Sequence, residues 1–402
     1  MKIGVWLKFS VFNLFIVAVL GLYLRLKMAY ELPLEQKNIL HAHSHFAFIG
    51  WVSQTLMVLL INYIKDKKND IVLKKYVFIL IANMICSYAI LFTFIFKGYF
   101  SLSILFLTIS IVIGYIFSIY FYKDTKNLDR ENSLKWFYGA LIFNFISSLG
   151  TFFLGYSMAA DKINLDLYSS SIYFYLHFQY NGWFIFGCIG LFLSLFNLKL
   201  NTTKSVNKLF YLMFISTLIT YGLSILWLDI PKIIYAVIAF FGVFQFLIWL
   251  KMQKIILVNY KNELIKQPKY LQFILIVISL CLNIKFLLQA LLFIPSFAEM
   301  AYQNRPFIIA FLHLVLLGVV SLFLLYFIFK QQIITASKTT KYALSTVTVS
   351  IILNEIFLVS QGLGPFIPIH FSYINKILLV IAALLVISIG WLYLSTLKRK
   401  AT

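Results

Sequence analysis

Long apolar runs, separated by short polar stretches, recur along the whole chain. Each run reaches the ~18 residues that a helix needs to cross the hydrocarbon core of a bilayer. The pattern predicts an all-α, polytopic membrane protein with about twelve transmembrane helices. Because the connections are short, we expect residues 1–402 to form a single transmembrane domain in a lipid bilayer. The predicted spans are approximately 4–24, 40–63, 74–95, 99–122, 135–158, 169–196, 207–228, 231–250, 270–294, 305–329, 342–361 and 375–396.

The composition agrees with this prediction. The chain is 62% hydrophobic and only 12% charged, whereas soluble domains carry about 25% charged residues. A large water-soluble core is therefore excluded. The three cysteines, Cys86, Cys188 and Cys281, all lie inside apolar runs, which argues against a disulfide framework.

The net charge of +21 does not indicate a nucleic-acid partner, because the basic residues lie in the short loops between apolar runs. Of the 34 Lys and Arg residues, 25 fall on the side that holds both termini. Such an asymmetry predicts cytoplasmic N- and C-termini and insertion in the inner (plasma) membrane. The first apolar run has no small-residue cleavage site after it, so we expect a retained helix. The opposite side holds Arg25, Lys27, Lys37, Lys97, Lys162, Lys232, Arg305 and Lys376.

With this orientation, every histidine is predicted to lie in or near the outer half of the membrane. At a helical rise of about 1.5 Å per residue, His45 lies about 8 Å inside the outer surface, and His177 and His313 lie about 12 Å inside. His41 and His43 fall at the outer rim of the same helix as His45, where His41 and His45 share a face and His43 points away. His370 is predicted to lie in an outer loop.

Three further polar residues are predicted in the outer halves of spans. Lys285 and Gln289 lie one turn apart in one helix, and Glu355 lies in another. A charge inside the bilayer costs several kcal/mol unless it is paired or faces a polar cavity. Lys285 and Glu355 are therefore either a structural pair or part of a proton or substrate site, and Gln289 is placed to share that site.

Neutral imidazole is a good ligand for iron, copper and zinc. Two imidazoles from different helices can hold a b-type haem, and three can hold copper or zinc. A lone histidine in a helix is often only hydrogen-bonded to a neighbouring helix, but histidines at similar depth on three helices favour a metal or haem site. Asp and Glu are nearly absent from the spans, which argues against a site for a hard cation.

At these histidines the chain resembles subunit I of the haem–copper oxidases and nitric oxide reductases. The stretch 311–318, Phe-Leu-His-Leu-Val-Leu-Leu-Gly, is similar to the family pattern His-x-His-x-Val-Leu-x-x-Gly. His313 matches the second histidine of that pattern, which implies a ligand of the low-spin haem. The segment His43-Ser-His45, followed by Gly-Trp, resembles the family's other low-spin ligand segment. Depth favours His45 over His43 as the partner of His313.

The resemblance also implies what is missing. His177 matches a copper ligand of the family, but Phe311 stands where the high-spin haem ligand would be. Residues 207–228 hold no histidine pair to complete a copper site. Asn181 stands where oxidases have a tyrosine, and Tyr180 is one position short. The resemblance therefore implies a retained b-type haem, with His177, Tyr180 and Asn181 lining a vestigial or repurposed second site, and no oxygen or nitric oxide reduction by the usual mechanism.

The leading hypothesis is therefore a b-type haem protein in electron transfer or gas response, served by a redox partner or a quinol. One alternative is a copper- or zinc-binding membrane protein, or a transporter, that uses His41, His45 and His177. The inner halves of the spans offer few polar residues for a transport path, which ranks transport lower. Another alternative is a non-catalytic assembly subunit in which the polar residues are structural.

Overall fold

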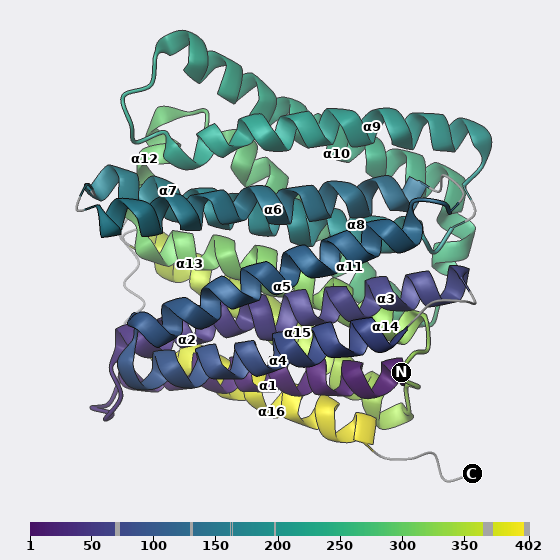
Figure 1. Ribbon diagram of the computed structural model, residues 1–402, viewed down its shortest axis with the longest axis horizontal. Helices are drawn as coiled ribbons and strands as arrows, with labels where there is room; N and C mark the ends of the chain where they lie inside the picture. Colours follow the sequence, from purple (N-terminus) through teal and green to yellow (C-terminus); the bar gives the residue numbers. More distant parts are fainter. Residues whose placement is uncertain are drawn as a thin grey trace. The chain divides into compact units, whose positions relative to one another are not determined.

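The computed structural model describes residues 1–68, 73–128, 132–160, 162, 164–196, 198–364 and 373–397. Within these ranges all regular secondary structure is helical (Figure 1). The predicted all-α class is confirmed for this part of the chain. The helices divide into two compact units, which we call unit 1 (Met1–Leu128 with Ser321–Thr402) and unit 2 (Asp129–Val320).

Unit 1 brings the two ends of the chain together. Its first helix lies beside its last (Figure 1), and the ring centroid of Phe12 lies 5.1 Å from that of Tyr393. The elements of unit 1 are α1 (Ile3–Lys27), α2 (Gln36–Phe46), η1 (Ala47–Ser53), α3 (Gln54–Lys67), α4 (Leu73–Lys97), α5 (Ser101–Thr125), α14 (Leu322–Lys330), α15 (Lys338–Leu363) and α16 (Ile374–Leu397).

Unit 2 is built from consecutive helices that pack on their neighbours in sequence. Its first helix contacts the next three elements, and its longest helix lies between the elements before and after it. The elements are α6 (Asn132–Ala159), α7 (Leu165–His177), η2 (Phe178–Phe184), α8 (Ile185–Leu193), α9 (Leu200–Ile219), η3 (Thr220–Ile225), α10 (Lys232–Ile265), α11 (Lys269–Leu291), α12 (Pro295–Gln303), α13 (Arg305–His313) and η4 (Leu314–Ser321), whose last residue belongs to unit 1.

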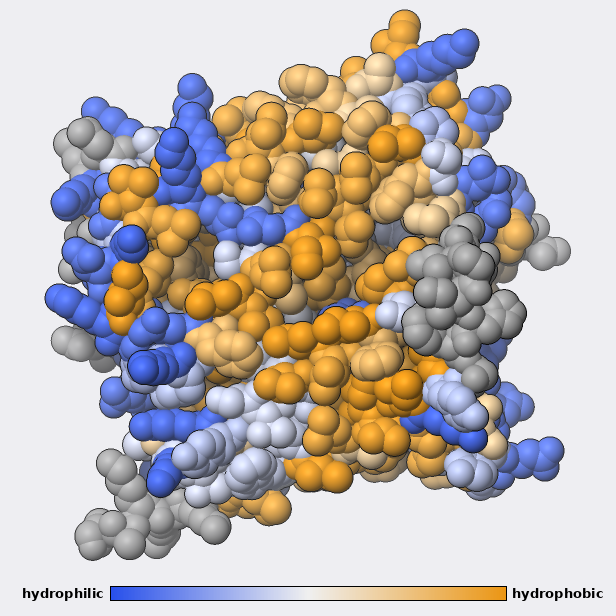
Figure 2. All heavy atoms as spheres, turned by 180° about the vertical axis from the view of Figure 1, so that it is seen from behind, coloured by the Kyte–Doolittle hydropathy of each residue, from blue (hydrophilic) through white to orange (hydrophobic). Residues whose placement is uncertain are grey.

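Eleven helices of the described residues are long and apolar enough to cross a membrane, and they coincide with eleven of the predicted spans. Hydrophobic side chains cover the middle of the helical surface, and hydrophilic ones gather toward the helix ends (Figure 2). Large exposed apolar patches of this kind mark a membrane-facing surface. The chain is therefore a multi-pass membrane protein. Strongly exposed apolar side chains include Phe78, Phe96, Tyr156, Ile233, Val258 and Val380.

The remaining predicted span, 169–196, corresponds to α7, η2 and α8, which follow one another without a break from Leu165 to Leu193. It is not among the eleven, because the polar residues in its middle lower its apolar character. Those residues are His177, Gln179 and Asn181, and all three are buried. The polar residues that lower the hydropathy of this span therefore lie inside the helical packing and not on its surface.

Two connections differ from the prediction. The stretch 251–265 was expected in a loop but continues α10, with a kink at Tyr260 (φ −129°, ψ 16°). Its Lys, Gln, Met and Leu residues have high helix propensity, so the helix extends past the apolar run. The second difference is α12, which begins at Pro295, a residue suited to the first turn of a helix.

Candidate functional site

Three spans change from α-helix to π-helix, and each change follows a histidine. η1 begins two residues after His45, η2 begins directly after His177, and η4 begins directly after His313. π-Helical turns are rare and occur frequently at functional sites. The same three histidines are those predicted to lie deepest in the membrane, whereas the π-helical turns were not predicted from the sequence.

A glycine lies five residues after each of these histidines, at Gly50, Gly182 and Gly318. A Cβ atom at Gly318 would lie 2.9 Å from the Sγ of Cys281, and one at Gly182 would overlap the Phe143 side chain. The glycines therefore permit close packing where the helix is wound wider. The shared spacing His-x-x-x-x-Gly is visible in the sequence and is the signal that could have located the three turns.

The carbonyls of η1 are capped by side chains from neighbouring helices. Asn13 donates its Nδ2–H to the carbonyl of Gly50 (2.6 Å), and the Tyr88 hydroxyl donates to Asn13 Oδ1 (2.8 Å). Asn83 Nδ2 donates to the carbonyl of Ile49 (3.3 Å). A π-helical turn breaks the regular i→i−4 ladder, and buried carbonyls need other donors. Asn13 and Asn83 supply these donors. Neither residue was predicted from the sequence to have a role at this site.

His43 points away from His41 and His45 and contacts α1. Its Nδ1 lies 3.0 Å from the carbonyl oxygen of Val17. A carbonyl can only accept, so Nδ1 carries the hydrogen, and in a neutral ring the lone pair lies on Nε2. Gly21, one turn after Val17, makes room for the ring, because a Cβ there would lie 3.4 Å from His43 Cε1.

His41 and His45 share a face of α2, as their i,i+4 spacing predicts. Their ring centroids are 6.2 Å apart in a stacked arrangement. His45 Nε2 lies 2.9 Å from the hydroxyl of Tyr99, and the Phe94 ring packs against His45 with a centroid distance of 4.8 Å. His45 is therefore held in an aromatic cluster with a tyrosine hydroxyl on one ring nitrogen.

His313 adopts the same ring arrangement as His43. Its Nδ1 lies 2.8 Å from the carbonyl oxygen of Ile309, so Nδ1–H donates and the lone pair of the neutral ring lies on Nε2. Two residues earlier, Phe311 packs edge-on against Tyr180 at a centroid distance of 6.1 Å. Phe311, which stands where the resembling family pattern has a histidine, thus makes an aromatic contact within unit 2.

His177 differs from the other histidines because both of its ring nitrogens are engaged inside unit 2. Nε2 lies 2.9 Å from the carbonyl oxygen of Thr217, and Nδ1 lies 3.0 Å from Nδ2 of Asn181. Nε2–H therefore donates to the carbonyl, and Nδ1 accepts from the amide. Thr217 is in the last turn of α9, which narrows into the 3₁₀ segment η3. With this pairing, no lone pair of the neutral ring remains for a metal ion.

The other predicted site residues are buried. Tyr180 is buried, and its ring packs edge-on against Phe311. Lys285 and Gln289 lie on α11 with 0% and 5% of their surface exposed. Lys285 and Gln289 belong to unit 2.

Glu355 is on α15 in unit 1, where one carboxylate oxygen accepts a hydrogen bond from Asn354 (3.1 Å). The predicted pairing of Lys285 with Glu355 thus joins residues of different units. The predicted copper or zinc ligands are also divided, with His41 and His45 in unit 1 and His177 in unit 2. Among the described residues, no group of three or more His, Cys, Asp and Glu side chains is arranged to hold a metal ion. His370 lies outside the described residues.

No protein-family model matches the chain, and no curated protein matches its sequence. The resemblance to haem–copper oxidases therefore rests on the histidine segments themselves.

Proposed function

We propose that this chain is a b-type haem-binding membrane protein, distantly related to subunit I of the haem–copper oxidases, with a role in electron transfer or gas response. The proposal is supported by the hydrogen bonds of two imidazole rings. His43 and His313 each donate Nδ1–H to a backbone carbonyl. A carbonyl on one ring nitrogen fixes the ring orientation and increases the basicity of the other nitrogen, as is typical of metal-ligating histidines.

His43 in unit 1 and His313 in unit 2 are therefore each proposed as a haem ligand. This proposal departs from the sequence expectation, which favoured His45 on the basis of depth. His45 Nε2 lies beside the Tyr99 hydroxyl, whereas the Nδ1–H of His43 donates to a backbone carbonyl, as is typical of a metal-ligating imidazole. Each of these imidazoles suits haem iron in its donor chemistry, and a haem supplies reversible one-electron transfer when bound.

The surroundings of His177 favour a structural role over a second redox centre. Both nitrogens of its ring are engaged, and Phe311 occupies the place of the family's high-spin ligand. We therefore propose electron transfer or gas response and not oxygen or nitric oxide reduction. The electron donor would be a protein partner or a membrane quinol.

The proposed setting is the inner (plasma) membrane, crossed twelve times with both termini in the cytoplasm. The polar span α7–η2–α8 is counted as a membrane span because it is continuous over 29 residues, the summed length of its three elements. At about 1.5 Å per residue this length exceeds the bilayer core. The excess of basic residues on the side of the termini supports the orientation.

An optical spectrum of the detergent-purified chain, oxidised and then reduced with dithionite, tests the proposal. We expect a sharp reduced α-band and iron in the same sample. His43→Ala and His313→Ala should each abolish or strongly shift the band. His41→Ala is the matched control, because His41 lies on the same helix but packs in the aromatic cluster, and it should leave the band unchanged.

The spectra of the variants distinguish His43 from His45 as the haem ligand, and they test whether haem is bound at all. A band that survives His43→Ala but is lost in His45→Ala would return the ligand role to His45. A featureless visible spectrum, from cells shown to supply haem, would refute the proposed function.

A second candidate is a copper- or zinc-binding protein, favoured by the stacked His41 and His45 rings on one helical face. Histidines at i and i+4 can ligate a common metal ion. Copper or zinc in the purified protein at a constant ratio to the chain, lost in His41→Ala and without iron, would support this candidate over haem.

A further inference from the structure

A lysine without a counter-ion lies inside unit 2. Lys285 on α11 has no exposed surface, and its Nζ has no hydrogen-bond partner. The nitrogen lies 3.8 Å from the ring centroid of Phe286. A cation–π contact contributes only about 0.5–2 kcal/mol, whereas burial of an unpaired charge costs several kcal/mol. A charged Lys285 therefore requires a compensating group.

A hydrogen-bond chain of fixed direction ends one helical turn from Lys285. The Thr217 hydroxyl donates to the carbonyl of Met213 (2.9 Å), so it accepts from Gln245 Nε2 (2.8 Å). Gln245 Oε1 in turn accepts from Gln289 Nε2 (2.7 Å). The amide of Gln289 is thereby oriented with its Oε1 outward, and this oxygen has no hydrogen-bond partner.

A second branch starts from the same threonine. Its carbonyl accepts from His177 Nε2, and His177 Nδ1 accepts from the amide of Asn181. Asn181 Oδ1 is then left without a hydrogen-bond partner. Both branches therefore start from Thr217. Each branch ends on a neutral amide oxygen.

Neither amide oxygen makes a hydrogen bond to Lys285 Nζ, and neither carries a net charge that could balance an ammonium. The acidic residues of unit 2 within the described ranges are Asp166, Asp229, Glu263 and Glu299, and each lies in a loop, near the end of a long helix or in the short helix α12. The local arrangement therefore has donors, oriented dipoles and a cation, but no anion.

We propose that Lys285 is the centre of a buried binding site for a small monovalent anion, of the class of chloride or formate. The ammonium directs its N–H groups to the anion, because Nζ makes no hydrogen bond to the protein. Hydrogen bonds that involve a charged group are stronger than neutral ones. The complete burial of Lys285 restricts the site to small anions. This site is independent of the proposed haem.

Chloride binding to the full chain, in nanodiscs of phosphatidylcholine, tests the proposal. The measurement is the ³⁵Cl NMR linewidth during titration with potassium chloride, with potassium gluconate keeping the ionic strength constant. The wild type should show saturable broadening. Lys285→Met, which keeps the length of the side chain but removes its charge, should weaken binding at least about tenfold.

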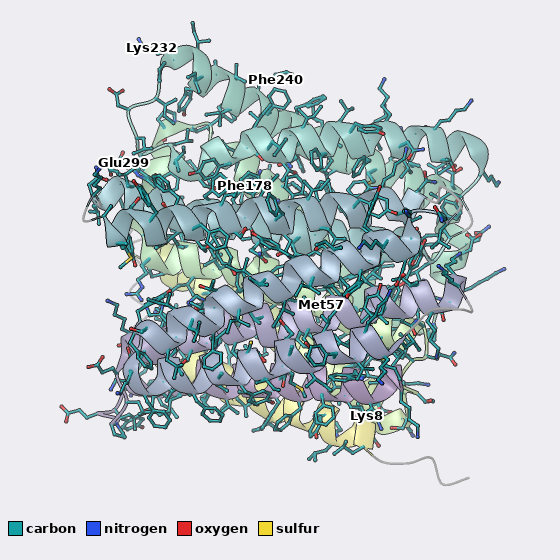
Figure 3. The ribbon with its side chains drawn as sticks, viewed as in Figure 1. Lys8, Met57, Phe178, Lys232, Phe240 and Glu299 are labelled. Atoms are coloured by element: carbon teal, nitrogen blue, oxygen red, sulfur yellow. The ribbon has the colours of Figure 1, made fainter. Side chains whose placement is uncertain are left out.

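Lys232→Met is the matched control, because Lys232 is an exposed lysine at the start of α10 in the same unit (Figure 3). It should bind chloride as the wild type does. If Lys285→Met does not fold, the wild type alone decides, because binding to the native state must raise its unfolding temperature in chloride or formate over that in gluconate.

The proposal is overturned if the wild type shows neither saturable broadening nor a higher unfolding temperature in chloride and formate. It is also overturned if Lys285→Met binds chloride as tightly as the wild type. Since haem absorbance is not used in these measurements, a failure here is distinct from a failure of the proposed function.

Discussion

Asn13→Ala should destabilise unit 1, because Asn13 is the polar link between α1 and the π-helical turn η1. Its side chain is 1% exposed, donates to the Gly50 carbonyl at 2.6 Å and accepts from the Tyr88 hydroxyl at 2.8 Å. Alanine removes both bonds and leaves a buried carbonyl without this donor.

The expected magnitude follows from two lost bonds. A hydrogen bond contributes about 0.5–1.5 kcal/mol net in proteins, and interhelical bonds in membranes average ~0.6 kcal/mol with a maximum of ~1.7 kcal/mol. We therefore expect Asn13→Ala to lower the free energy of unfolding by about 1–3 kcal/mol. Because η1 begins two residues after His45, the variant should also lose part of any bound haem.

Reversible unfolding in mixed micelles, titrated with sodium dodecyl sulfate and followed by tryptophan fluorescence, measures the difference. Asn62→Ala is the control, since Asn62 makes a hydrogen bond only to Asp66 on the exposed surface (2.9 Å). Its effect should stay within about 0.5 kcal/mol. If Asn13→Ala unfolds with the wild-type free energy, the capping of η1 by Asn13 has no energetic role and our reasoning is wrong.

Three further predictions concern packing, a buried hydrogen bond and topology. Gly182→Ala should destabilise the fold by about 1–3 kcal/mol through overpacking, whereas Gly155→Ala, where a Cβ would meet no atom within 4 Å, should be neutral or slightly stabilising in the same unfolding assay. Trp51→Phe removes an indole N–H that donates to Ser321 Oγ (2.8 Å) and should cost about 0.5–1.5 kcal/mol, with Trp51→Leu costing more because the ring is also lost. Alkaline phosphatase fused after residue 230 should be active and fused after residue 335 should be inactive, and the reverse pattern would contradict the predicted orientation.

The sequence by itself determined the membrane class and the positions of the spans. Apolar runs of sufficient length specify helices in a bilayer because every backbone group must be satisfied within its own segment. This requirement is local, and the eleven candidate spans accordingly coincide with predicted ones. The shared face of His41 and His45 was equally predictable, since it depends only on helical periodicity.

Only the tertiary structure decided which nitrogen of each histidine is engaged. Depth ranked His45 above His43, but the ranking of ligands depends on partners that lie far away in sequence, such as Val17 for His43 and Tyr99 for His45. His177 matched a family copper ligand in the sequence, yet the carbonyl of Thr217 and the amide of Asn181 occupy its ring. Hydrogen-bond partners across helices have no fixed sequence spacing, so no pattern along the chain predicts them.

The π-helical turns and the surroundings of Lys285 were likewise determined partly by the sequence and partly by the tertiary structure. The His-x-x-x-x-Gly spacing is present in the sequence, but a wider helical turn is stable only where a neighbouring helix fills the space beside the glycine and caps the released carbonyls, as Asn13 does for Gly50. Lys285 could be identified as an unusual charge from its position in an apolar run. That Gln289, one turn away, presents an amide oxygen without a hydrogen-bond partner follows from the order of donors and acceptors through Gln245 and Gln289, which only the packing of α9, α10 and α11 establishes.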